Sequence, residues 1–226
     1  LKEFEGRIET SVGITSNSDD NNNKLVGVLN IPLVDDRLAL RTAAYRFKSA
    51  GYIDRVSTPA VEALAAATGL SVDLSEDLAA HTYKGGRMSL LWQASEDLKF
   101  TLMFATQTLE EDGGSFIDVS LGGYKSAVLD GPEFNEEDFD IANLVVEYDL
   151  GWATFLGTFS NFDGSSIRQR TAEDAFLGGT IISFSDDKEG DTVELRLASQ
   201  LDGPLQFVGG FYYEDFTRQS DQVGEW

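Results

Sequence analysis

The sequence predicts an all-β fold, an antiparallel transmembrane β-barrel wall of about nine meandering strands. Segments that alternate apolar and polar residues recur along the chain, and the links between them are in turn long and short. The short links are 34–37, 94–97, 149–151 and 202–204, and the long ones run roughly over 16–23, 49–81, 110–138 and 162–190. Tight turns at one end of the strands and long loops at the other are the usual layout of a membrane barrel, whereas soluble domains seldom have such loops.

The clearest strand is 4–14, where Ile8 and Val12 lie on one face and Arg7 and Glu9 on the other. Period two with charges on a single face indicates a wall between apolar and wet surroundings. The other expected strands are 25–33, 38–47, 87–93, 98–105, 142–148, 152–161, 193–201 and 205–214. Strands of about nine to twelve residues match the length that crosses a bilayer at a tilt. Within the loop 49–81, the Ala-rich run 59–67 begins with Pro59 and precedes Gly69, which predicts a short helix.

Composition narrows the possible functions. The net charge of −22 argues against nucleic acid, whose binding needs clustered Lys and Arg. No apolar stretch approaches the roughly eighteen residues of a membrane helix, and the absence of cysteine excludes disulfides and thiolate chemistry. Hydropathy alone leaves open an alternative interpretation, a soluble secreted β-sandwich that binds carbohydrate. The acidic residues of the expected loops suit either solvation or bridging by divalent cations.

Aromatic residues gather near the expected strand ends. Trp92, Tyr148 and Trp152 are next to short links, and Tyr45, Phe47, Tyr83, Phe159, Phe162 and Tyr213 are nearer the long loops. Two such bands are typical of the interfacial girdles of a membrane barrel, although ordinary cross-strand packing also gathers aromatic side chains. His81 is the only histidine, and no serine elbow or phosphate-cradling glycine loop accompanies it. We therefore expect no enzymatic activity, no cofactor and no metal site.

Several segments resemble TonB-dependent outer-membrane receptors. They are 27–33 (GVLNIPL), 37–41 (RLALR), 51–54 (GYID), 85–92 (GGRMSLLW), 194–199 (ELRLAS) and 207–213 (FVGGFYY). The resemblance implies a 22-stranded barrel that is closed by a plug and takes up a scarce nutrient with energy from the TonB complex. Ferric siderophores are the most common substrates of the family, beside cobalamin, haem and saccharides. Residues 1–226 are then part of the barrel domain, with the plug domain and the C-terminal strands outside this chain.

The resemblance also implies a location, partners and candidate sites. The chain is expected in the outer membrane of a Gram-negative cell, with short turns periplasmic and long loops extracellular. Its expected partners are lipid, its own plug and, through it, TonB, together with a small-molecule substrate. Lumen-facing charges that could contact plug or substrate are Arg41, Arg87, Glu194 and Arg196, and possible loop contacts are Tyr52, Phe116 and Tyr124. A plugless porin-like channel is the alternative within membrane barrels.

Overall fold

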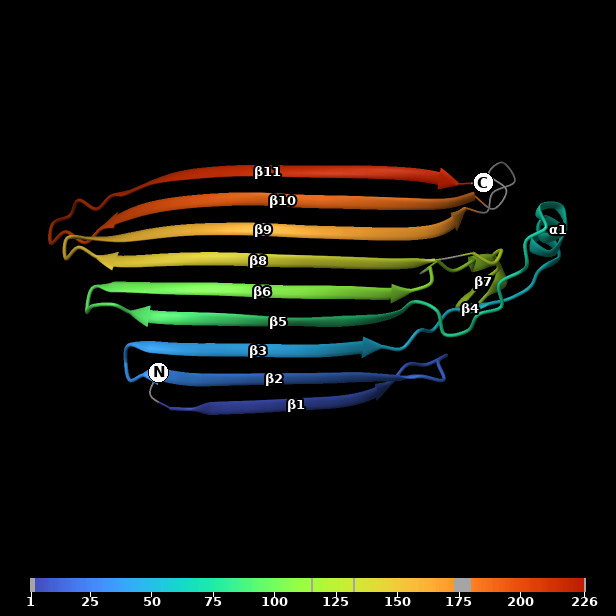
Figure 1. Ribbon diagram of the computed structural model, residues 1–226, viewed down its shortest axis with the longest axis horizontal. Coiled ribbons are helices and arrows are strands. Elements are labelled where there is room, and N and C mark those ends of the chain that lie inside the picture. Colours follow the sequence, from blue (N-terminus) through green and yellow to red (C-terminus); the bar gives the residue numbers. More distant parts are fainter. Residues whose placement is uncertain (1–2, 115, 132, 173–179, 226) are drawn as a thin grey trace.

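In a computed structural model, nine strands form one antiparallel sheet whose order follows the chain (Figure 1). The structure describes residues 3–114, 116–131, 133–172 and 180–225. The nine strands are β1 (Glu5–Ile14), β2 (Asn21–Val34), β3 (Leu38–Ser49), β5 (Ala80–Gln93), β6 (Leu98–Asp112), β8 (Phe134–Asp149), β9 (Ala153–Ala172), β10 (Thr180–Ser199) and β11 (Val208–Glu225). The predicted all-β antiparallel wall is confirmed.

Three of the four expected long loops differ from the prediction. Residues 162–172 and 180–190 belong to β9 and β10, which pair continuously, and β6 and β8 extend into the expected loop 110–138. β2 begins at Asn21, so the link before it is short. The reason is physical: an antiparallel ladder continues into water with polar side chains on both faces, whereas apolar alternation marks only the stretch beside an apolar medium.

Register places alternate residues of all nine strands on two common faces. The banded face carries Ile8, Leu29, Leu90, Leu102 and Leu195, and the polar face carries Arg7, Asn30, Ser89, Asn143 and Glu194. On the banded face, large apolar side chains stay exposed, with Ile8 at 79% and Ile14 at 85%. A soluble sheet covers such a face with another layer, because exposed apolar area costs free energy in water.

The apolar band crosses the hydrogen-bonded rows obliquely. The row that starts at Ile8 on β1 reaches Asp140 on β8 and Glu189 on β10, all on the banded face. On β10 the band lies nearer the short-turn end, from Val193 to Leu197. A band that shifts along successive strands is what a sheet needs when its strands tilt relative to a flat apolar layer, as in a barrel.

Two long loops, 50–79 and 113–133, fold together into what we call the loop lobe, at one end of the sheet (Figure 1). It contains β4 (Asp54–Arg55), which pairs in parallel with β7 (Lys125–Ser126), the helix α1 (Pro59–Thr68) and the 3₁₀ turn η1 (Val119–Leu121). The predicted helix is confirmed: Thr58 caps its start by accepting from the Val61 amide, and Gly69 ends it at φ 78°. Ile53 and Leu129, the largest fully buried side chains of the described residues, lie in the lobe.

Candidate functional site

The four charges singled out in the sequence lie on the polar face but form two separate groups. Arg41 on β3 pairs with Ser89 on β5, and Arg87 is two residues away on the same strand. The Arg41 Nη1 donates to Asn30 Oδ1 at 3.0 Å, and Arg41 lines a shallow hollow of about 520 Å³ with Asn30, Ser89 and Thr101. Glu194 and Arg196 lie on β10, beside Tyr212, and the strands β6, β8 and β9 separate them from the first group.

The expected girdle near the long loops is partly wrong. Tyr45, Phe47, Tyr83 and Phe162 point to the polar face, while Phe159 and Tyr213 lie on the banded face. The error has a simple cause, since position along a strand gives the depth of a residue and only its parity gives the face. On the polar face, the His81 ring packs edge-on against Tyr83 at 5.5 Å and lies 6.2 Å from Phe47. His81 therefore belongs to an aromatic cluster.

The loop residues proposed as ligand contacts come together in part. Tyr52 and Tyr124, from the two loops of the lobe, meet edge to face with ring centroids 5.3 Å apart. Two backbone bonds hold them there: Tyr52 N donates to Leu78 O at 2.9 Å, and Asp54 N donates to Tyr124 O at 3.0 Å. Phe116 is 69% exposed. The two loops of the lobe therefore bring aromatic side chains together, and backbone hydrogen bonds hold them in place.

A buried ion triad locks the two loops to one another. The Arg55 guanidinium pairs with Asp73 from its own loop and with Glu133 from the other, and the three side chains are 3%, 10% and 10% exposed. Arg55 Nε has no hydrogen-bond partner among the described residues. Burial raises the pKa of Asp73, but hydrogen bonds from Ser75 and from Arg55 outweigh it, so the pKa lies below its usual value. Sequence reasoning missed this triad because its members are far apart in the chain.

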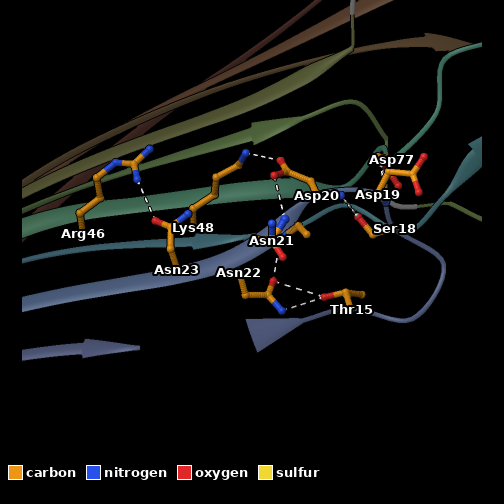
Figure 2. A network of polar contacts seen from close by, with 11 residues as sticks. Thr15, Ser18, Asp19, Asp20, Asn21, Asn22, Asn23, Arg46, Lys48 and Asp77 are labelled. Atoms are coloured by element: carbon orange, nitrogen blue, oxygen red, sulfur yellow. Dashed lines mark hydrogen bonds and ion pairs between the residues drawn. The ribbon is translucent and has the colours of Figure 1, made fainter. Parts of the chain in front are cut away.

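The link between β1 and β2 is anchored to the lobe by polar contacts (Figure 2). The amide of Asp19 donates to Asp77 Oδ2 at 3.1 Å, and the Ala50 amide donates to Asn22 Oδ1 at 2.7 Å. Asp20 pairs with Lys48 on β3, and this hydrogen bond, with that from the Asn21 amide, holds the pKa of Asp20 below its usual value. These bonds give a role to the Asn- and Asp-rich tract 19–23, which joins the lobe to the end of the sheet.

Nine acidic residues, most of them expected in loops, lie instead on the banded face of the strands, beyond the apolar band. They are Glu110, Glu136, Asp138, Asp140, Asp163, Asp187, Glu189, Asp191 and Asp215. Some oppose each other directly, as Asp140 and Asp163 do, which is an unfavourable arrangement for like charges. The banded face therefore carries much of the negative charge of the sheet, beside a few cations such as Arg46 and Lys84.

Arg168 and Arg170 form a further group, on a part of β9 that the sequence pattern predicted to be a loop. Both lie on the polar face with Phe184 of β10, the direct partner of Arg168. Their guanidinium carbons are 5.0 and 5.2 Å from the centroid of its ring. Two cations therefore share one aromatic ring near the loop end of the sheet.

The face pattern, the oblique apolar band and the continuous ladder define part of the wall of a β-barrel. In the part of the chain that the structure describes, no helix is long and apolar enough to span a membrane.

Comparison with solved structures agrees with this fold. The chain is similar to the crystal structure of the ferric yersiniabactin uptake receptor FyuA from Yersinia pestis, with a TM-score of 0.74 and 15% sequence identity. The match covers 99% of this chain and 32% of the receptor, so the chain spans about a third of that length. No protein-family model and no curated protein matches the sequence. At this identity the likeness shows the fold, an all-β barrel wall, and nothing finer.

Proposed function

We propose that this chain is part of the barrel wall of a TonB-dependent outer-membrane receptor that imports a scarce nutrient, a ferric siderophore. The observation that carries the proposal is the oblique apolar band across nine continuous strands, in a fold shared with a siderophore uptake receptor. The banded face then faces lipid and the polar face lines the lumen. Residues 1–226 belong to the barrel domain, and the plug domain and the remaining strands belong to the whole protein.

The orientation follows from the two ends of the sheet. The loop lobe lies at one end and the short links at the other (Figure 1). Outer-membrane barrels keep short turns on the periplasmic side and longer loops outside, so the lobe is proposed to be extracellular. The acidic stretches of β8, β9 and β10 then stand above the bilayer, where charged side chains on the outer face meet water.

Roles for individual residues follow from this orientation. Arg41, Arg87, Glu194 and Arg196 are proposed to contact the plug or the substrate from the lumen wall. Tyr52, Tyr124 and Phe116 are proposed to contact the ligand from above, on the lobe. The work of the protein is binding and transport, with TonB reached through the plug, and we propose no catalytic step, resident cofactor or nucleic-acid partner.

Of the two alternatives, the soluble β-sandwich finds no support. A sandwich buries its core between two sheets of comparable size, but the described residues form one nine-stranded sheet and a two-stranded ladder in the lobe. A plugless channel would have the same kind of barrel wall as the receptor, so only a measurement of transport distinguishes the two.

Uptake by cells tests the proposal. Cells that express the full-length protein under iron starvation are given radiolabelled ferric siderophores, with and without a functional TonB complex. The proposal predicts uptake that requires TonB. Uptake that persists without TonB indicates a porin, and a protein found only in the soluble fraction, with no heat-modifiable gel mobility, overturns the membrane assignment.

A further inference from the structure

The arginines at the loop end of β9 lie where the proposed lumen opens outward. Arg168 and Arg170 are two positions apart on the polar face, and both are exposed. They lie well beyond Phe159, which pairs with Val193 at the edge of the apolar band. Since strand residues rise by about 3.3 Å each, these side chains are far outside the apolar layer. Both guanidinium groups therefore meet water on the inner wall of the entrance.

These two cations have no anionic partner among the described residues, although the chain has a net charge of −22. Among the described residues, neither guanidinium has a carboxylate within ion-pair distance. The carboxylates nearest in register have other partners. Asp186 accepts from Arg218 at 2.8 Å and from Ser220, while Asn135, the direct partner of Arg168, donates to Glu137 at 3.2 Å. In the described part of the chain, no carboxylate neutralises either arginine, although the chain is strongly acidic.

The Phe184 ring explains how two like charges are held together. Each guanidinium carbon is within 5.2 Å of its centroid, so the two cations lie no farther apart than the sum of the two distances. Cation–π contact favours both positions over the ring. Contact with the ring face leaves N–H donors at the guanidinium edges free, and these match the two oxygens of a carboxylate.

From this arrangement we infer that Arg168, Arg170 and Phe184 form an anion-binding site that receives a small molecule carrying two or more carboxylate groups. Each guanidinium binds one carboxylate of the same molecule. The site lies at the entrance, so its role is the first capture of an anionic substrate. This inference rests on the proposed function for its biological meaning, because it names the chemical class of the imported ligand, but binding itself does not depend on transport.

Citrate is the probe for the test. Its binding to the full-length protein, purified in detergent, is measured by calorimetry for wild type, R168Q, R170Q and the double variant R168Q/R170Q. Each exposed charge pair contributes about threefold to fivefold to affinity, so the double variant is expected to bind about ninefold to twenty-five-fold more weakly. Arg46 is an exposed arginine on the banded face, and R46Q is expected to leave citrate binding unchanged.

The variant R168K/R170K separates charge from geometry and guards against misfolding. It keeps both cations but loses the planar forks, so it is expected to bind citrate more weakly than wild type while keeping the salt dependence. Wild-type protein that does not bind citrate, unchanged binding in R168Q/R170Q, or an equal loss in R46Q would each overturn the site. TonB-independent uptake with intact citrate binding would instead contradict the proposed function and leave the anion site standing.

Discussion

Replacing Arg55 with methionine should unfold the loop lobe while leaving the sheet intact. The substitution removes the cation from a triad whose carboxylates, Asp73 and Glu133, are only 10% exposed. Removing one partner of a buried ion pair costs about 3–5 kcal/mol, because the remaining charge stays buried without compensation. The apolar cluster around Ile53 is small, so this loss is comparable to the whole stability expected of such a local unit.

Hydrogen exchange read by mass spectrometry measures this effect on the full-length protein. The amides of Asp54, Val56, Asp73 and Asp130 bond within the lobe, and all four of these bonds join its two loops to one another. In R55M their protection is expected to fall about a hundredfold or more, in both loops together, with β6 unchanged. The variant R46M is the control, since Arg46 is exposed and bonds Asn23 outside the lobe.

A triple variant, R55M/D73L/E133L, gives the converse result. Apolar residues in place of the whole triad leave no buried charge, so protection of the lobe is expected to return toward the wild-type value. If R55M keeps wild-type protection, or if only one loop loses it, the triad is not what joins the loops. That outcome would refute the reasoning.

Three smaller perturbations test other parts of the structure. Because the pKa of Asp73 is lowered in the folded lobe, its carboxylate stabilises the lobe at pH values above the unfolded pKa of about 4. This contribution is lost as the pH falls through the lower pKa of the folded state. Hydrogen exchange of the lobe amides, measured between about pH 7 and pH 3, shows whether their protection falls only at the acid end. G51A places a Cβ 1.6 Å from the carbonyl oxygen of Asp77, so it should raise lobe exchange strongly, whereas G27A, with nothing within 4 Å, should not. T58A removes the cap of α1 and should destabilise that helix by about 1 kcal/mol, seen as faster exchange at Val61 and at the next amides, while an unchanged rate would mean that the cap contributes nothing.

The fold was predictable wherever one face of a strand had to be apolar. Met88 and Leu90 alternate with Arg87 and Ser89, and the structure places them on opposite faces as the alternation requires. The strands beyond the apolar band could not be found in this way. Residues 162–172 and 180–190 carry polar side chains on both faces, so only their backbone pairing, which no residue pattern shows, makes them strands.

The candidate sites were predictable as faces but not as contacts. The alternation placed Arg41 and Glu194 on the same face, but it could not show that four strands lie between β3 and β10. The Tyr52 and Tyr124 contact and the Arg55 triad depend on two loops folding against each other, and the sequence separation of 78 residues between Arg55 and Glu133 hides that pairing. The pair Arg168 and Arg170 was not predicted, because the part of β9 that carries it was expected to be a loop.

Site-directed spin labelling along β5 of the full-length protein in lipid vesicles tests the central claim most directly. Single labels at 87, 88, 89 and 90 are compared for collisions with oxygen, which concentrates in lipid, and with a water-soluble nickel chelate. A barrel wall predicts that labels at 88 and 90, on the banded face, meet oxygen, while those at 87 and 89 meet the nickel chelate or, under a plug, neither reagent. Equal oxygen access at all four positions, or the nickel chelate reaching 88 and 90, would contradict the membrane wall.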